Sequence, residues 1–315
     1  MYNKMLRIER ILCPIDFSQG SDEALRYAVA LARAYGAKLL LLNCTKFNSV
    51  NEKSESTHLG LETVIAFQKT LCRHLGLASL NQIDWEPLAI KSVKDVGEAI
   101  THQAAKHHVD LIVMRSRRRP YAALLRGSTA ETLSRAAPCP VLITHPRERE
   151  WVGLSTGEID LQRILVAYDF SSDAEVALNY GASLAQEYQA ELHLLNVLSQ
   201  AEPKEPELAW TVTESAYPQA ARKLQRAIPR ETFLWCPVTN AVRFGRPYRE
   251  VLAYAEEHNI DLICMGAGGT RFSVGALLGS NVDRVLRQAP CPVLVTRPIK
   301  RANSAVDEVG TLALK

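Results

Sequence analysis

The sequence predicts an α/β protein of two tandem, doubly wound domains, each built on an open five-stranded parallel sheet. The first observation is an internal repeat, and the second is an alternation of short apolar runs with helical segments. Four motifs recur in the same order, 151 to 153 residues apart: RILCPIDFS and RILVAYDFS, LLLLNC and LHLLNV, VDLIVM and IDLICM, and APCPVLITHP and APCPVLVTRP. A duplicated domain of about 150 residues explains this near-constant offset.

The second repeat shows the alternation of elements most clearly. RILVAYDF predicts a strand, and Ser171 or Ser172 predicts the N-cap of the helix that follows it. AELHLLNV predicts the next strand, a helical stretch at about 207–228 is broken by Pro218, and FLWCPVTNAVRFG predicts a strand and turn. The remaining runs predict a helix at YREVLAYAEEHN, a strand at IDLICM, a helix at SNVDRVLRQA and a strand at PVLVT. Right-handed crossovers place the carboxyl ends of all these strands on one edge, where ligands of such sheets bind.

The domain boundaries follow from the repeat. We expect a first domain at 1–146, a polar linker at 147–160, a second domain at 161–298 and a tail at 299–315. Trp210 and Trp235 are expected to pack against other side chains and not to bind a ligand. Cys13, Cys44 and Cys264 fall within apolar runs and are expected to be buried.

The composition excludes several classes of protein. A net charge of +3 is too small to indicate nucleic acid, and no run approaches the roughly 20 apolar residues of a membrane helix. The start of the chain does not resemble a signal peptide, and seven cysteines at wide spacings form no C-x-x-C motif. We therefore expect a cytoplasmic protein without nucleic-acid or membrane partners. The histidines at 102, 107 and 108 do not converge on one helix face, so we predict no metal site.

A glycine-rich segment follows the fourth predicted strand of the second repeat. Gly266 and Gly269 come directly after IDLICM, and Gly279 and Ser280 open the next helix, giving the spacing G-x-x-G-x9-G-[ST]. Glycines lack the Cβ that would hold a phosphate away from the backbone, and helix N-termini attract anions. The segment lacks the G-K-[ST] ending of a Walker A loop. It therefore predicts phosphate binding beside Asp169, which ends the first strand of the same repeat and has helix capping as its alternative role.

These motifs resemble the universal stress protein family over nearly the whole chain, and an adenine-nucleotide alpha-hydrolase-like fold is implied. The nucleotide-binding branch of that family holds ATP or a related adenine nucleotide at the strand edge. The resemblance places Ala167 and Asp169 by the ribose and adenine, although Ala167 departs from the proline usual there. It places the backbone of Val197 by the adenine edge. The ribose–phosphate turn and the phosphates would contact the other residues of the predicted site: Met265, Gly266, Gly269, Gly279, Ser280 and Asn281.

The first repeat departs from this pattern. Arg115 and Arg118 stand where the second repeat has Gly266 and Gly269, whereas Gly127 and Ser128 are kept. By resemblance the first repeat is similar either to the family members that lack the motif and do not bind ATP or to a weakened site formed by these four positions with Pro14 and Asp16, which would keep the adenine end. A dense arginine loop results, which is interpreted either as a solvated loop or as a contact for an anion.

The resemblance implies a stress-response sensor or adaptor whose state follows the bound ATP, ADP or AMP, with Mg²⁺ accompanying the phosphates. The alternative is an interaction scaffold of the same fold without nucleotide. No catalytic residue is predicted, and at most slow ATP hydrolysis is expected. A third reading, an enzyme such as an AMP-forming ligase, lacks its usual S-G-G-x-D-S or H-I-G-H motif.

Family members pair their last strands across a dimer. Here PCPVLIT and PCPVLVT end the two repeats, and unpaired last strands would be sheet edges that need cover. We expect the two repeats to pair with each other as an intrachain pseudo-dimer about an approximate two-fold axis, and a further homodimer stays open.

Overall fold

The computed structural model describes residues 6–46, 61–75, 83–116, 129–145, 149–153, 156–199, 206–268 and 279–297. Each repeat contributes five strands, and within a repeat all of them run parallel, as predicted. The strands are β1 (Arg10–Pro14), β2 (Lys38–Lys46), β3 (Trp85–Val93), β4 (Leu111–Arg115), β5 (Val141–Thr144), β6 (Arg163–Ala167), β7 (Glu191–Leu198), β8 (Val238–Phe244), β9 (Leu262–Gly266) and β10 (Val293–Thr296).

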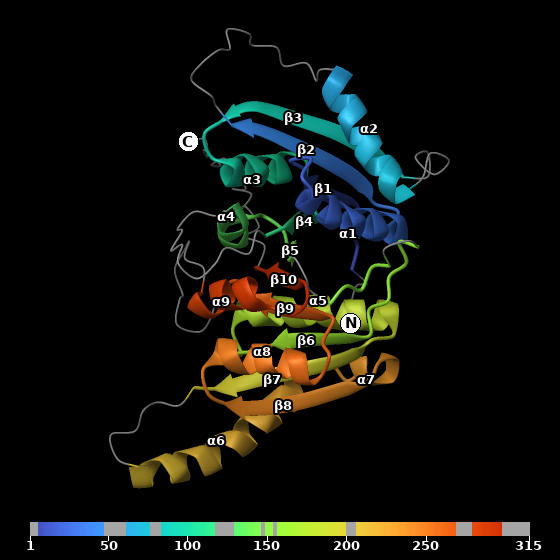
Figure 1. The fold of residues 1–315 in the computed structure, drawn as a ribbon. Helices are drawn as coiled ribbons and strands as arrows, with labels where there is room; N and C mark the ends of the chain where they lie inside the picture. Colours follow the sequence, from blue (N-terminus) through green and yellow to red (C-terminus); the bar gives the residue numbers. More distant parts are fainter. Residues whose placement is uncertain are drawn as a thin grey trace, which may run out of the picture.

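The two five-stranded sheets join into one continuous sheet. Its strand order is β3-β2-β1-β4-β5-β10-β9-β6-β7-β8, which can be followed from top to bottom in Figure 1. The last strands of the two repeats, β5 and β10, pair antiparallel, with Leu142 directly opposite Leu294. These two leucines occupy equivalent positions of the repeat, so an approximate two-fold axis passes between them. The predicted pairing of the two repeats through their last strands is therefore present.

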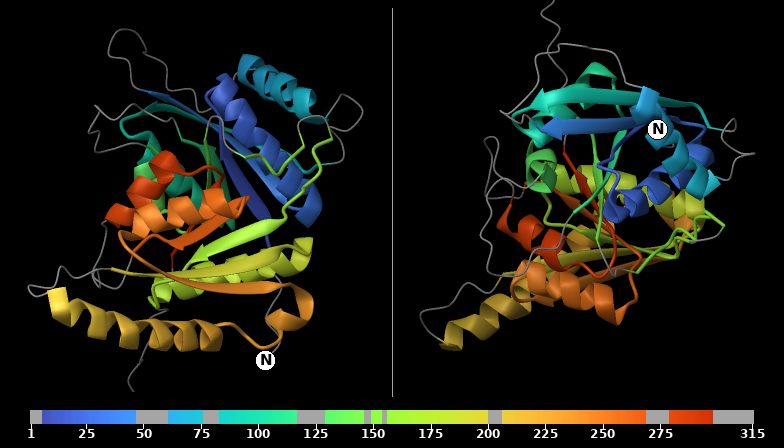
Figure 2. Two further views of the ribbon diagram at one scale, coloured as in Figure 1. Left: turned by 60° about the horizontal axis from the view of Figure 1, so that its bottom comes forward. Right: turned by 45° about the horizontal axis from the view of Figure 1, so that its top comes forward.

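Helices cover both faces of the sheet (Figure 2). One face carries the helices whose buried side chains include Leu25, Leu71, Leu178 and Leu224, and the other carries those that bury Ile100, Leu133, Val251 and Val285. The first set is α1 (Gln19–Tyr35), α2 (Leu61–Leu75), α5 (Ser172–Tyr188), α6 (Pro206–Ala227) and α7 (Thr232–Trp235). The second set is α3 (Val96–Lys106), α4 (Thr129–Ala136), α8 (Pro247–Glu257) and α9 (Ser280–Gln288). Each face has a core that runs through both repeats.

Ser171 is the N-cap of α5, and its hydroxyl accepts a hydrogen bond from the amide of Ala174 at 3.2 Å. Of the two serines proposed from the sequence, the first is thus the cap. Ser18 caps α1 in the same way, since its hydroxyl accepts from the amide of Ser21. The matching caps explain why both helices begin five residues after the end of a strand.

Two predictions of secondary structure were wrong. The helix α6 continues through Pro218 and is not broken there. Pro218 is exposed, so water can bond the carbonyl that the proline leaves without its helical donor. FLWC is not a strand, because Thr232–Trp235 form the short helix α7, and β8 begins only at Val238.

Trp235 does not pack inside its domain, since it is 53% exposed beside the exposed Phe233 and Leu234. Cys13 and Cys264 are buried as predicted, whereas Cys44 is only half-buried. All seven cysteines are free thiols. Among the residues described, no helix combines the length and the apolar character needed to cross a bilayer.

The linker has a polar composition, but two of its apolar residues are buried in the structure. Trp151 and Val152 lie within the predicted linker, yet both are more than nine-tenths buried. Val152 also forms an isolated antiparallel bridge with Ile159. The described part of the linker around Trp151 and Val152 therefore packs into the core.

We expect His193 on β7 to make the folding stability depend on pH. It is 3% exposed, its Nδ1 lies 3.0 Å from the Tyr254 hydroxyl, and its Nε2 lies 3.4 Å from Glu191. Burial lowers the pKa of His193 below its ordinary value of about 6.5, against the opposing effect of Glu191, while His258 and Arg163 lower it further. Because the unfolded chain then binds the proton more readily, stability falls as pH drops below about 6.5.

We expect the free energy of unfolding to decrease below that pH by up to about 1.4 kcal/mol per unit from this group. Urea denaturation between pH 5 and 8 measures this, and His193→Gln is expected to flatten the dependence. His102 is exposed on α3, so His102→Gln serves as the control. An unchanged pH dependence in His193→Gln would remove His193 as its cause.

Candidate nucleotide site

The candidate site of the second repeat lies at the carboxyl ends of β6 and β9. Ala167 on β6 is the register partner of Met265 on β9, so these two predicted residues are neighbours in the sheet. Val197 lies near the end of β7, the strand on the other side of β6. The side chain of Asn196 donates to the carbonyl of Tyr168 at 2.7 Å and fixes the chain as it leaves β6. The fold thus brings the proposed adenine and ribose positions to one edge.

Asp169 caps the turn that leads into α5. Its Oδ1 accepts hydrogen bonds from the amide of Ser171 at 3.1 Å and from the Ser171 hydroxyl at 2.5 Å. Between them Phe170 has a φ of 64°, a left-handed conformation that is unusual for a bulky residue. The Phe170 ring packs edge-on against Tyr168 at a centroid distance of 5.2 Å, which supports this turn. Asp169 therefore does not cap α5 itself but holds its N-cap, Ser171, at the edge where the nucleotide was predicted.

Gly266 provides a close approach between β9 and the start of α5. A Cβ at this position would lie 2.6 Å from the Asp173 Cβ and 2.7 Å from its carbonyl carbon, so no side chain fits. The Asp173 carboxylate then accepts a hydrogen bond from the amide of Gly268 at 2.8 Å. One amide at the beginning of the glycine segment is thus held by a carboxylate.

The two ends of the glycine segment, at Ala267 and Gly279, lie next to each other. The amide of Gly279 donates to the carbonyl of Ala267 at 3.0 Å, and the amide of Ala267 donates to Thr296 at the end of β10. Gly279 is the N-cap of α9 and makes no side-chain capping bond, and Ser280 is exposed at the first position of that helix. Asn281 follows it in the first turn. The N-terminus of α9 therefore presents backbone amides without a capping side chain, as an anion site requires.

The site is only partly described. Gly269 falls outside the described residues, as do Arg118, Gly127 and Ser128 of the first repeat. Within the described part of the chain, no group of three or more His, Cys, Asp or Glu side chains is arranged to hold a metal ion.

The first repeat has the same turn at the end of β1. Asp16, two residues after Pro14, accepts from the amide and hydroxyl of Ser18, and Phe17 has a φ of 58°. Its β4 differs, because Arg115 lies where β9 has Gly266. The Arg115 guanidinium forms an ion pair with Glu23 on α1, and the arginine side chain is only 11% exposed. Arg115 therefore packs on a helix of its own domain.

A glycine on the helix accommodates this arginine. A Cβ at Gly20 would lie 3.0 Å from the Arg115 Cδ, and Gly20 is the repeat equivalent of Asp173. One repeat thus has a glycine on the helix and a large residue on the strand, and the other repeat has the reverse. Sequence reasoning missed this exchange, although aligning the two repeats at both positions would have exposed it.

Comparison with known proteins agrees with the fold. The model of the universal stress protein family matches the chain twice, at residues 7–145 and 161–297. A universal stress protein from Thermus aquaticus is 34% identical over 147 residues, which is 42% of this chain and 97% of that protein. Universal stress protein Rv2623 from Mycobacterium tuberculosis is 28% identical over 55% of this chain and 56% of its own length. Protein PA1789 from Pseudomonas aeruginosa superimposes with a TM-score of 0.64 at 20% identity, covering 94% of this chain and 95% of that one, which supports the fold.

Proposed function

Because the chain belongs to the universal stress protein family, with the family domain present twice in tandem, we propose that its second repeat binds ATP or a related adenine nucleotide. The observation that carries the proposal is the meeting of the two ends of the glycine segment, through Gly279 and Ala267, at the uncapped N-terminus of α9. Phosphates placed there would accept hydrogen bonds from backbone amides, with the positive end of the helix dipole beside them. Ala167, Asp169 and Val197 lie along the same edge for the nucleoside.

The negative charge of the Asp173 carboxylate affects how a polyphosphate would bind. It lies at the first glycines of the segment, where it would repel a polyphosphate at close range. Mg²⁺ bound with the phosphates would offset this repulsion. We therefore expect the nucleotide to bind with Mg²⁺, and the protein to act as a sensor or adaptor in the stress response. Cytoplasmic location and self-association as a homodimer belong to the same proposal.

Gly279→Ala tests the phosphate contact without disturbing the fold. Gly279 has a φ of −60°, and a Cβ there would lie 3.5 Å from the Ala267 carbonyl and 3.6 Å from Val282, which are ordinary contacts. We expect stability to fall by no more than about 1 kcal/mol, because alanine is a poorer N-cap than glycine. ATP affinity by calorimetry should fall at least about tenfold, or about 1.4 kcal/mol, because the methyl group holds the phosphates off the amides.

AMP serves as the internal control, because its single phosphate depends less on the end of the glycine segment. Its affinity is expected to change by less than that of ATP. Unchanged ATP affinity in Gly279→Ala would place the phosphates elsewhere. If the unmodified protein binds neither nucleotide, the second candidate function, an interaction scaffold without nucleotide, is supported. The hydrogen bond from the Gly268 amide to Asp173 favours this second candidate, because that amide is already occupied. Turnover is assayed separately, since no residue is assigned a catalytic role.

A further inference from the structure

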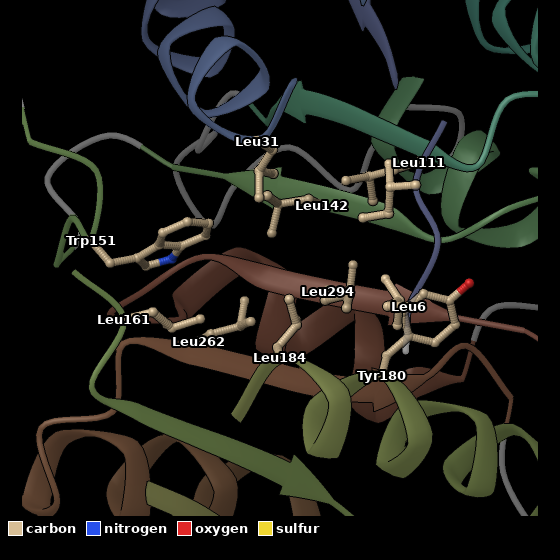
Figure 3. A pocket seen from close by; sticks show the side chains of 11 residues that line it. Leu6, Leu31, Leu111, Leu142, Trp151, Leu161, Tyr180, Leu184, Leu262 and Leu294 are labelled. Carbon is tan, nitrogen blue, oxygen red and sulfur yellow. The ribbon is translucent and has the colours of Figure 1, made fainter. Parts of the chain in front are cut away.

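The seam between the two repeats is packed too closely to hold a ligand. Figure 3 shows leucines of both repeats facing one another across the seam, among them Leu31, Leu142, Leu184 and Leu294. The space between them that a water-sized molecule can reach is about 20 Å³, which is enough for about one water molecule. A further partner is therefore expected at the surface of the described residues and not between these leucines.

Three arginines of the second repeat converge on one tyrosine, Tyr248, in the first turn of α8. The Arg249 Nε donates to the Tyr248 hydroxyl at 3.0 Å. The Arg284 guanidinium, which comes from α9, lies over the tyrosine ring at 4.6 Å from its centroid. Arg246 is the N-cap residue of α8. The hydrogen bond from Arg249 lowers the pKa of the Tyr248 phenol, and Arg246 and Arg284 lower it further. We call Arg246, Arg249 and Arg284 the arginine cluster.

No carboxylate of the described residues neutralises the arginine cluster. All three arginines are exposed, and none of them forms an ion pair with a described residue. Arg287 lies about one turn further along α9 and is instead paired with Asp283 at 2.9 Å. On β8, Arg243 is paired with Glu257. The concentration of unpaired positive charge is therefore particular to the arginine cluster and is not shared by the arginines near it in the chain.

The equivalent place in the first repeat has the opposite charge. Asp95, Glu98 and Thr132 stand where the second repeat has the arginine cluster. The Asp95 carboxylate caps α3 by accepting from the amide of Glu98 at 2.9 Å, whereas α8 has no side-chain cap. A Cβ at Gly97, the equivalent of Tyr248, would lie 2.6 Å from the Thr132 Cβ, so no tyrosine fits there. One repeat thus has an internal anion at this helix start, and the other has three cations.

The compact shape of the arginine cluster favours one doubly charged group as its ligand. The guanidinium groups of Arg249 and Arg284 lie 5.8 and 4.6 Å from the centroid of the same ring. A phosphate monoester carries a charge of about −1.5 to −2 at pH 7 and has three acceptor oxygens, which planar guanidinium groups bind in pairs. A nucleic acid needs an extended basic stripe, whereas Glu250 and Asp283 interrupt the positive charge on the two helices.

The exposure of the arginine cluster favours a phosphate group that is carried by a protein. Water competes for exposed charges, so a free phosphate ion would bind weakly at this surface. A protein that covers the arginines excludes that water, and arginine and tyrosine are enriched among the residues that dominate protein interfaces. We propose that the arginine cluster binds a phosphorylated segment of a partner protein. This interaction adds a class of partner to the adaptor role, and it holds whether or not the second repeat binds ATP.

Peptide libraries with random flanking residues test the proposal. Their fixed central residue is phosphoserine, phosphothreonine or phosphotyrosine, and matched libraries carry the residue without phosphate. The immobilised full-length protein is expected to retain phosphopeptides and not their counterparts. The affinity of a retained phosphopeptide is then measured by calorimetry. If no phosphopeptide is retained, or if the counterparts are retained equally, the proposal is wrong.

Single substitutions identify the residues that bind the phosphate. Arg249→Gln and Arg284→Gln are each expected to weaken the retained phosphopeptide about five- to tenfold, because a charge-assisted hydrogen bond is lost at an exposed place. Arg287→Gln is the matched control, since it removes the same charge from α9, but from an arginine already paired with Asp283. It should change the affinity less than about twofold. An equal loss in Arg287→Gln would reduce the effect to net charge and overturn the assigned contacts.

Arg246→Asp copies the first repeat and provides a variant that is expected to fold. Its aspartate can cap α8 as Asp95 caps α3, so stability in urea should be kept or increased. The affinity for the retained phosphopeptide should fall at least about tenfold, because a carboxylate then lies beside the phosphate. A folded Arg246→Asp protein that binds the phosphopeptide as tightly as the unmodified protein would exclude the arginine cluster as its site.

Three other ligands are compared by competition with the retained phosphopeptide. Inorganic phosphate should compete at least about tenfold more weakly than the unlabelled phosphopeptide does. Single-stranded oligothymidine and ATP should not displace the phosphopeptide. If one of the three displaces it as effectively as the phosphopeptide itself, the arginine cluster takes a small anion, a nucleic acid or the nucleotide, and the proposed partner is wrong.

Discussion

Gly266→Arg, which copies Arg115 of the first repeat into the second, is expected to destabilise the protein by about 3 kcal/mol. The reason is steric, because any side chain at Gly266 meets the backbone and Cβ of Asp173 at less than 3 Å. Backbone at the start of α5 cannot move aside as a flexible side chain could. Urea denaturation monitored by circular dichroism measures the loss of stability.

The first repeat indicates how to rescue this variant. Asp173→Gly recreates Gly20, and Val176→Glu recreates Glu23, the partner of Arg115. The triple variant should regain part of the lost stability, because Asp173→Gly removes the contact with the Asp173 Cβ and Val176→Glu supplies a carboxylate, while the contact with the backbone of residue 173 remains. Val176→Glu alone is the control, and its effect should stay within about 0.5 kcal/mol. A triple variant as unstable as Gly266→Arg would show that the exchange between the repeats is not the cause.

Arg26→Ala is expected to cost about 2–4 kcal/mol of stability, because it removes the ion pair and the hydrogen bond that hold the linker against α1. The Arg26 side chain is 5% exposed, its Nη2 lies 2.6 Å from Glu150, and its Nη1 donates to the Val152 carbonyl at 2.5 Å. Without the guanidinium, that carbonyl loses its donor in a buried place and Glu150 loses its counterion. Glu150 is one-third exposed, so solvent limits the electrostatic part of the cost.

The repeat supplies the control for this prediction. Asn179 is the equivalent of Arg26 in the second repeat and is exposed on α5, so Asn179→Ala should change stability by less than about 0.5 kcal/mol. Trp151 is the neighbour of both linker contacts, and its fluorescence should shift to longer wavelength in Arg26→Ala as the linker detaches. An Arg26→Ala protein with unchanged stability and emission would mean that packing of Trp151 alone holds the linker.

The sequence was sufficient for the fold because the repeat fixed both the number of strands and their order along the chain. It also indicated the β5–β10 pairing, since two apolar last strands needed cover. Local errors arose where tertiary packing or solvent decided the outcome. Pro218 is exposed, so a helix that lacks one hydrogen bond there continues, and Phe233–Trp235 form an exposed helical turn despite their strand-like composition.

The candidate site was predictable in its position and less so in its contacts. Spacing located Gly266, Gly279 and Asp169 on one edge, because the carboxyl ends of parallel strands share that edge. It could not show that Arg115 turns onto α1, since its partner Glu23 is 92 positions earlier in the chain. Spacing also could not show that Phe170 is left-handed in a turn that contains no glycine. That conformation is stabilised by the hydrogen bonds between Asp169 and Ser171, which form only in the folded turn.

The antiparallel junction of β5 and β10 also affects how the two halves can evolve. When identical subunits meet across a dyad, every mutation appears on both sides at once. Covalent fusion removes that constraint, so one half can carry arginine at the end of its fourth strand while the other carries glycine at the equivalent position. The two repeats thus pair like the subunits of a heterodimer although they belong to one chain, and each can specialise without losing its partner.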